Sequence, residues 1–462
     1  MRNIFYCTIF SFSKLSACYS AIPDHTTITR DVAIFGGGAS GSFAAIQLRD
    51  AGKSVVVVEG QDHLGGHSHA FHDPVNGASA DFGVQLFQNV SLIQDFYGRY
   101  SIPLKPAFGA PGVTVTADFL TGHPVDLPVY TTNETVAAFA RYSALEVKYS
   151  YLDDGVFLPE IVPDELLLPF NVIVTRYSLQ PLVPTFNVFL QGWPDFDHLL
   201  FVYVLRYVSK SLVYALETGT LVRSATNDNG QVYRAVQTEL GPDALLSSTV
   251  VQARRSTSGG GYQQLWVRSS NGTVLVRAKK ILVSVPTVLE NMGGFDLDLQ
   301  ESSLFRRLRP MNHWTGLLRG TDIPQDTTIT NSGENTTFHS IQLPGSSGFT
   351  PTADSLLHGF VYTSYEPTSE SETKHRVLEE LQRLRSHHLV NGTNPQFAAI
   401  KHHSNYAITV SAKDIKNGFY RRLYALQGHR ATYYTGAQFA AQGTVPVFNF
   451  TVNHVLPLLL QD

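Results

Sequence analysis

The chain has 462 residues, of which 43% are hydrophobic and 16% charged, and its formal net charge is −4. A chain of this length can build more than one domain with a large core. The weak negative charge and the lack of a long basic run exclude nucleic-acid binding, and no apolar run is long enough to predict a transmembrane segment.

The first residues predict a targeting segment. Arg2 precedes an apolar stretch from Ile4 to Phe12, and small residues follow as far as Ala21. This order is typical of a secretory signal peptide. We therefore expect residues 1–21 to be removed and the protein to enter the secretory pathway or be secreted. A leader without fixed structure is the alternative interpretation.

The cysteines and the glycosylation sequons agree with that expectation. Cys7 and Cys18 both lie in the predicted signal peptide, so the mature chain would have no disulfide bond and no flavin attached through cysteine. Acceptor sequences for N-glycosylation, which predict a secreted glycoprotein, begin at Asn89, Asn133, Asn271, Asn335, Asn391 and Asn449.

A strand, a helix and a second strand follow. The apolar run from Asp31 to Phe35 predicts a buried strand, and the run Val55 to Val58 predicts another. Between them, Ser40 to Ala51 has helical spacing, and Gly52 is placed to end the helix. These elements form the βαβ unit of a dinucleotide-binding domain.

The glycines of this unit predict how a nucleotide binds. Gly36 makes the tight turn, Gly38 lets a pyrophosphate approach the backbone, and Gly41 permits close packing of helix on strand. The helix begins at Ser40, where its N–H groups would face the phosphates. Glu59, at the end of the second strand, would accept hydrogen bonds from ribose hydroxyls, which favours FAD or NAD over NADP. An ordinary glycine-rich turn is the alternative.

A second glycine pair favours FAD. Gly65, Gly66 and His67 follow Glu59 closely. This order resembles the extended FAD fingerprint of the flavoprotein amine oxidase and glutathione reductase type. The resemblance implies that the pair lets the backbone pass along the FAD pyrophosphate and ribityl chain, and that His67 lies near the flavin, where it contacts cofactor or substrate.

Two central segments extend the resemblance. Ala244 to Val251, which includes Val250, resembles the adenine-side strand of that family. Arg277 to Pro286 resembles the returning strand with its terminal proline. The resemblance implies that Val250 is a cofactor-binding residue.

The C-terminal part resembles the closing flavin motif. Thr432 to Ala437 contains Gly436, and Gly443 to Pro446 contains Val445 and opens an apolar helix. By resemblance, Gly436 and Val445 bind the cofactor. The N-terminus of this helix would face the pyrimidine carbonyl of the flavin and stabilise negative charge on the reduced ring.

Finer details narrow the resemblance. His67 stands where arginine is commoner, and Asp81 to Gln85, Gly418 to Tyr420 and Ala425 to Gly428 are also similar to one group. That group is the β-cyclopiazonate dehydrogenases, secreted-type fungal FAD oxidoreductases of secondary metabolism. The resemblance implies an α/β fold: a Rossmann-like FAD-binding domain of the glutathione reductase and amine oxidase type, with an interleaved α+β substrate domain.

The resemblance also predicts the domain organisation. FAD-domain segments are expected at 27–100, 232–300 and 420–462. The insertions at 101–231 and 301–419 would together form the substrate domain, or cap, which would set specificity.

The insertions contain two predicted helices. Leu199 to Leu216 has few charges and many apolar residues, which predicts a buried helix beside the substrate cavity. Lys374 to His388 predicts an amphipathic surface helix with mixed charge.

The source of electrons follows from what the sequence lacks. No second dinucleotide-binding motif is present for NAD(P)H, so the flavin would take electrons from the substrate itself and pass them to another acceptor, for which we expect oxygen. Between Ile281 and Thr373 there is no lysine. In amine oxidases a lysine lies near the flavin in this region, so an amine substrate is in doubt. Hydride removal from carbon of a hydrophobic small molecule, with cyclisation as one outcome, fits better.

The histidines supply candidate catalytic residues. His313, just before a strand predicted over Trp314 to Arg319, is the first candidate for a general base, because imidazole titrates near neutral pH. His67 is the second candidate catalytic residue, and a structural role is the alternative for each. His402, His403 and Tyr406 could line the cavity, without an assigned role. No metal site is expected at His69 and His72, because FAD binding already explains this segment and no cluster of carboxylates accompanies the two histidines.

Two other functions share the fold. One is a flavin-dependent double-bond isomerase of fatty-acid type, which needs no external acceptor. The other is a binding protein without catalytic activity, similar to the Rab GDP-dissociation inhibitors, which retain a related fold without flavin. The glycines and Glu59 argue against that interpretation, since it has no need of them.

Overall fold

A computed structural model of the chain describes residues 26–107, 112–256, 261–270, 272–352 and 356–461. The predicted signal peptide, both cysteines and the sequon at Asn271 lie outside the described residues.

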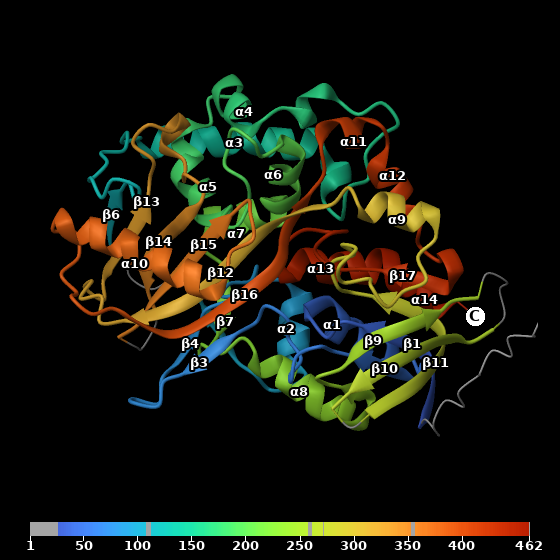
Figure 1. Cartoon of the computed structure of the whole chain (residues 1–462). Coiled ribbons are helices and arrows are strands. Elements are labelled where there is room, and N and C mark those ends of the chain that lie inside the picture. The colour runs from blue at the N-terminus through green and yellow to red at the C-terminus, as the bar shows by residue number, and fades with distance from the viewer. Residues whose placement is uncertain (1–25, 108–111, 257–260, 271, 353–355, 462) are drawn as a thin grey trace, which may run out of the picture.

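A first sheet carries the predicted βαβ unit (Figure 1). Its strand order is β8-β2-β1-β11-β10-β9, and β17 pairs with β11. The strands are β1 Thr27–Phe35, β2 Val55–Val58, β8 Ala244–Leu245, β9 Thr249–Arg254, β10 Gln263–Ser269, β11 Gly272–Val283 and β17 Thr432–Tyr434. All four valines of β2 are buried, as expected for an inner parallel strand that is covered on both faces.

Helices pack against this sheet and against one another. They are α1 Ala39–Asp50, α2 Ser91–Gly98, α8 Gln231–Leu240, α13 Thr444–Phe450 and α14 Leu456–Leu460, with a π-helical turn at Thr451–Val455. Phe43 of α1 stacks on Phe448 of α13 with ring centroids 4.0 Å apart, so the C-terminal helix lies against the first helix of the chain. The α/β fold with a Rossmann-like domain is confirmed.

A second sheet is built from two distant parts of the chain. Its order is β16-β12-β15-β14-β13-β6. The strands are β6 Val113–Ala117, β12 Arg309–Arg319, β13 Thr327–Asn331, β14 Gly345–Pro351, β15 His358–Ser364 and β16 Gln396–Thr409. Helix α10 Glu370–Ser386 packs on it through Val377, Leu381 and Leu384, which lie in one core with Phe349 and Phe360. Both predicted insertions thus contribute strands to the same sheet.

A layer of helices lies above both sheets in Figure 1. They are α3 Thr132–Lys148, α4 Phe170–Arg176, α5 Val183–Phe189, α6 Phe201–Tyr207, α7 Lys210–Thr218, α9 Leu299–Phe305, α11 Ala412–Lys416 and α12 Phe419–Tyr424. Two small antiparallel sheets pair β3 Ala70–His72 with β4 Ser79–Asp81, and β5 Leu104–Pro106 with β7 Val222–Ser224. None of the helices described is long and apolar enough to cross a membrane.

Three predicted elements differ from the structure. The helix expected over Leu199 to Leu216 is two helices, α6 and α7, because Val208 leaves the helical region with ψ of 70°. The strand expected over Ala244 to Val251 is likewise two strands, β8 and β9. His313 lies within β12, not ahead of the strand.

Candidate cofactor and substrate site

The turn between β1 and α1 brings backbone unusually close to backbone. A Cβ added to Gly41 would lie 2.0 Å from the carbonyl oxygen of Gly36, so only glycine lets the helix begin this close to the strand. The Ser284 hydroxyl donates to that same carbonyl at 2.7 Å. The predicted packing role of Gly41 therefore has a direct geometric basis.

Glu59 lies buried at the end of β2, with 8% of its surface exposed. Its Oε2 accepts from the N–H of Gly37 at 2.6 Å, and its Oε1 accepts from the N–H of Gln61 at 2.8 Å. These bonds hold the carboxylate in one orientation and leave other lone pairs available. Because Glu59 also lines the cavity described next, it can accept from a ribose hydroxyl.

A cavity of about 1450 Å³ runs along this turn. Drug-sized ligands occupy pockets of about 300–1,000 Å³, so this cavity has room for a dinucleotide and a second molecule. We call its first portion, beside the two glycine loops and α13, the cofactor part. The predicted cofactor residues that line it are Gly36, Gly38, Ser40, Glu59, Gly65, Gly66, His67 and Gly436.

The two glycine loops of the cofactor part face each other. A Cβ added to Gly66 would lie 3.0 Å from the Cα of Gly38. Because neither glycine has a side chain, the two adjoining backbones line a bare surface along which a pyrophosphate can lie. The donor set, backbone N–H groups with one carboxylate, suits phosphate on one side and ribose on the other.

Three predicted cofactor residues do not line the cavity. Gly41 lies behind the turn, and the side chains of Val250 and Val445 are buried in the core with 6% and 2% exposed. Their neighbours Thr249 and Thr444 line the cavity instead. A cofactor contact from either valine would have to come from its backbone, because apolar side chains are driven into the core.

We call the second portion of the cavity the substrate part. It lies between the six-stranded sheet and the helical layer, and its lining is largely uncharged. Representative residues are Thr114, Thr116, Phe189, Gln191, Tyr207, Thr330 and Val361. Among the described residues that line the whole cavity, the charged types are Glu59, Asp81, Arg223 and Glu290. Burial raises the pKa of Asp81 to about 7, so part of its population is neutral at physiological pH.

A cluster of four rings lines the cavity between these two parts. We call His67, His313, His403 and Tyr406 the ring cluster. The rings of His67 and His403 stack at 4.1 Å with planes 3° apart, and those of His313 and Tyr406 stack at 4.1 Å with planes 9° apart. His403 and His313 are 5.6 Å apart, so the two pairs adjoin.

Sheet pairing explains how the cluster assembles. His313 of β12 is the cross-strand partner of His403 in β16, which puts both rings on one face. Tyr406 should point the other way, because residues three apart in a regular strand face opposite sides. The register shifts between these positions, with Met311 opposite Tyr406, and this irregularity returns Tyr406 to the face of His403.

The imidazoles of the ring cluster are neutral at physiological pH. Burial lowers the pKa of His67 to about 4 and that of His313 to about 3, and it holds the pKa of His403 well below its usual range. The neighbouring imidazoles lower these values further, since two adjacent positive charges repel. Each ring therefore carries a single N–H at rest, and only its other nitrogen can accept a proton.

The three imidazoles differ in whether a ring nitrogen is hydrogen-bonded to another side chain. His313 Nδ1 lies 3.2 Å from the Thr363 hydroxyl, and His403 Nε2 lies 3.4 Å from that of Thr315. His67 forms no side-chain hydrogen bond within the part of the chain that the structure describes, and its ring is partly exposed. His67 is thus better placed than His313 to receive a substrate proton, although His313 stood first on sequence grounds.

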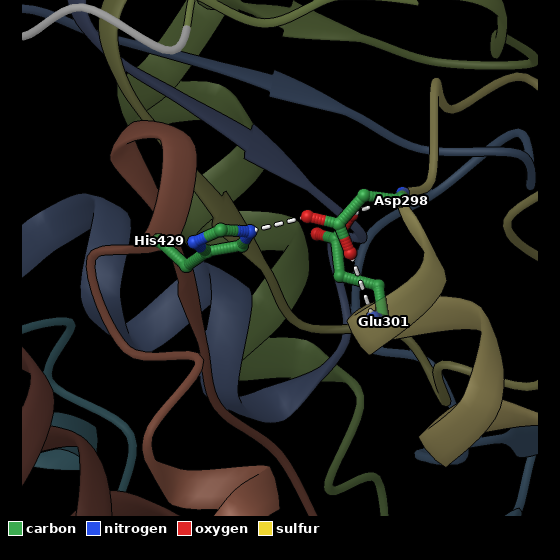
Figure 2. A group of neighbouring side chains, drawn as sticks. All are labelled: Asp298, Glu301 and His429. Carbon is green, nitrogen blue, oxygen red and sulfur yellow. Dashed lines mark hydrogen bonds and ion pairs between the residues drawn. The ribbon is translucent and has the colours of Figure 1, made fainter.

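A group with the spacing of metal ligands lies elsewhere. Figure 2 shows Asp298, Glu301 and His429, whose ligand atoms lie within 4.8 Å of one another. Asp298 and Glu301 cap helix α9 reciprocally, and His429 Nε2 lies 2.6 Å from Asp298 Oδ2. Arg255 binds Glu301 at 2.5 and 2.8 Å, with both side chains fully buried, and Arg430 is close to it. The acidic charge is balanced by arginine, so this group is a structural network.

The sequence matches known proteins over most of its length. Residues 34–100 match the family described as NAD(P)-binding Rossmann-like domain. An FAD-dependent oxidoreductase of Cochliobolus heterostrophus is 35% identical over 94% of this chain and 92% of its own. One of Emericella nidulans is 36% identical over 92% and 90%, and the beta-cyclopiazonate dehydrogenase of Aspergillus flavus is 31% identical over 93% and 92%.

Solved structures share the fold at low sequence identity. The CLA-producing fatty acid isomerase from P. acnes superposes with a TM-score of 0.73 at 17% identity, covering 92% of this chain and 97% of that one. Cyclohexylamine oxidase from Brevibacterium oxydans gives 0.65 at 16% identity, covering 93% and 98%. Both likenesses concern the architecture alone.

Proposed function

The chain belongs to the family of FAD-dependent oxidoreductases that includes beta-cyclopiazonate dehydrogenase, and on this premise we propose that it dehydrogenates an uncharged, hydrophobic small molecule. The protein is an enzyme, and FAD is its cofactor. The bond that is oxidised and the substrate class belong to the proposal.

The cofactor part of the cavity fits FAD. Gly38 and Gly66 would flank the pyrophosphate, and the Glu59 carboxylate would accept from the ribose. FAD supplies, when bound, an acceptor for a hydride and thus for two electrons. The remaining chemistry falls to the side chains of this chain.

The observation that carries the proposal is the continuity of the cavity. One hollow extends from Glu59 and the glycine loops, past the ring cluster, to Thr330 and Val361 of the six-stranded sheet. A small molecule in the substrate part would be in direct reach of the flavin, because both parts belong to one cavity. Direct transfer from substrate to cofactor needs such contact.

The lining favours an uncharged substrate. Its substrate part consists mainly of aliphatic, aromatic, hydroxyl and amide side chains. The imidazoles at its inner end are neutral, and the partly protonated Asp81 adds little charge. Among the described lining residues, Arg223 is the one cation, and Glu59, Glu290 and the partly protonated Asp81 are the acids. A permanently charged ligand would thus lose its hydration and meet few charged groups, which costs free energy.

His67 would complete the reaction as the proton acceptor. Dehydrogenation removes a hydride from one substrate atom and a proton from its neighbour, and a double bond forms between them. FAD, when bound, would supply the acceptor for the hydride, and the unprotonated ring nitrogen of His67 would take the proton. The ring is neutral beforehand, lines the cavity and has no competing hydrogen bond among the described residues.

We also propose the biological setting that the resemblance implies. The substrate would be an intermediate of fungal secondary metabolism, the acceptor oxygen, and the protein a secreted glycoprotein without residues 1–21. N-terminal sequencing of the secreted protein, deglycosylation and oxygen consumption during turnover test these points separately.

The main experiment is anaerobic reduction of the bound flavin. The purified holoenzyme is mixed under nitrogen with a panel of uncharged, hydrophobic small molecules, an unsaturated fatty acid, and cyclohexylamine. We expect lasting bleaching of the oxidised flavin bands by a neutral member of the set. Bleaching by the amine alone would contradict the substrate class. Conversion of the fatty acid to an isomer without lasting bleaching would favour the isomerase. A protein that never retains FAD would favour the binding-protein alternative.

A further inference from the structure

The ring cluster has an inner and an outer layer. His313 and His403 are buried, with 4% and 2% exposed, whereas His67 and Tyr406 are partly exposed. Each outer ring stacks on an inner one, His67 on His403 and Tyr406 on His313. The two outer rings are 5.8 Å apart. The substrate would thus meet His67 and Tyr406, with the other two rings behind them.

The His67 ring depends on His403 for its orientation. His67 follows directly after Gly65 and Gly66, which both have positive φ, so the backbone here follows an irregular path. No side-chain hydrogen bond to another described residue holds the His67 ring. Its closest ring partner is His403, at 4.1 Å and nearly parallel, and His403 belongs to β16 of the other sheet.

His403 is itself held from several sides. Its Nε2 lies 3.4 Å from the Thr315 hydroxyl of β12, and its ring lies 5.3 Å from that of His69 on the side of the cofactor part. It has almost no exposed surface and so cannot readily touch a substrate. A buried ring with its own hydrogen bond, stacked on a ring that has none among the described residues, is suited to orient it.

We propose that His403 is a positioning residue of the active site: it holds the His67 imidazole in one plane where the cofactor and substrate parts meet, with its ring nitrogens free for the substrate proton. This inference rests on the proposed function for its consequence in catalysis. The orientation itself belongs to the protein alone and can be measured without a substrate.

Stacking, rather than proton transfer, is the contact that His403 provides. The two rings lie face to face, and imidazole protons leave and arrive in the ring plane, so a proton cannot pass directly through the stack. A flat side chain without nitrogens should therefore serve nearly as well as histidine. The behaviour of such a variant therefore distinguishes a positioning role of His403 from a role as a second base.

The experiment compares three variants of the holoenzyme. His403→Ala removes the stack, and His403→Phe keeps a flat ring without nitrogens. His402→Ala is the matched control, because the ring of the adjacent His402 stacks on Trp314, and its Nε2 bonds to Asn312, so that it removes a neighbouring imidazole without removing the stack on His67. FAD affinity and thermal unfolding are measured for all three.

The first readout needs no substrate. In protein labelled with ¹³C in the histidine rings, the His67 resonance is assigned by its loss in His67→Gln. We expect this resonance to shift and broaden in His403→Ala and to remain sharp in His403→Phe and His402→Ala. An unchanged His67 resonance in His403→Ala would overturn the proposal.

The second readout is the rate of anaerobic flavin reduction by whichever neutral compound reduces the parent enzyme. We expect His403→Ala to lose about 10- to 100-fold, as misplacement of a reacting group does, with FAD affinity unchanged. His403→Phe should restore most of this rate. Equal losses in both His403 variants, or in His402→Ala, would overturn the positioning role. If no compound reduces the parent flavin, the proposed function fails, while the resonance of His67 still decides this inference.

Discussion

The imidazole of His67 lies face to face with that of His403, with ring centroids 4.1 Å apart and planes 3° from parallel. His67 comes from the glycine loop of the Rossmann-like domain and His403 from the six-stranded sheet. The contact therefore couples the part of the chain that would hold FAD to the part that would hold the substrate.

Glu59→Gln should weaken FAD binding. The amide can no longer offer two ionised oxygens, so the bonds to Gly37, to Gln61 and to the ribose cannot all persist. We expect the dissociation constant of FAD to rise about tenfold, or about 1.4 kcal/mol. Quenching of FAD fluorescence on titration into apoprotein measures it. Asp62→Asn, on an exposed neighbour, is the control, and unchanged affinity in Glu59→Gln would sink the assignment.

Gly192→Ala should disturb the ring cluster. A Cβ there would lie 2.4 Å from Cε1 of Tyr406 and 2.7 Å from Nδ1 of His313, so both rings must move. Gly219→Ala is the matched control, since Gly219 also has positive φ but open space around it. We expect the free energy of unfolding of each variant to fall by about 1–2 kcal/mol, because alanine is strained at positive φ. Flavin reduction should slow in Gly192→Ala alone; equal rates in the two variants would refute this.

Acid should destabilise the protein through its buried histidines. The pKa of His69 and that of His313 are both lowered to about 3, mainly by burial. Between pH 6.5 and 3 the unfolded chain binds protons at these residues and the folded chain does not. Their contribution to stability is therefore complete above pH 6.5 and lost as pH falls, by about 1.4 kcal/mol per pH unit for each histidine.

Urea unfolding at pH 7 and pH 5 measures this loss. His313→Gln should show a shallower decline between the two pH values than the parent protein, because one titrating group has been removed. The exposed His375→Gln is the control. A decline as steep in His313→Gln as in the parent would mean that other groups cause it.

Arg255→Met should strongly destabilise the fold. Arg255 and Glu301 form an ion pair with both side chains fully buried, so the substitution leaves a carboxylate without its main partner. Loss of one partner of a buried pair costs about 3–5 kcal/mol. Chemical unfolding measures the change, with the surface variant Arg99→Met as control. Added Zn²⁺ should not restore stability; restoration would indicate that the Asp298, Glu301 and His429 group binds metal.

The local features of the cofactor part could be predicted from the sequence. The strand before Gly36, the helix after Ser40 and the acidic residue at position 59 are adjacent or close in the chain, so their spacing alone specifies a βαβ unit. The side chains of Val250 and Val445 were harder to place. A strand or helix residue contributes backbone and side chain in different directions, and the pattern does not say which one reaches a ligand.

The ring cluster was decided by tertiary structure. His67, Gly192, His313 and His403 are far apart in sequence, and no local periodicity links them. His403 reaches His313 through strand pairing, and an irregularity in that pairing turns Tyr406 to the same face. Sequence alone determined that the chain binds a dinucleotide, because one short, contiguous turn holds its phosphates, and the nearby pair Gly65 and Gly66 added the resemblance that favoured FAD. Only the packing of two sheets decided which rings meet the substrate, because that site is shared between segments whose contacts depend on the whole fold.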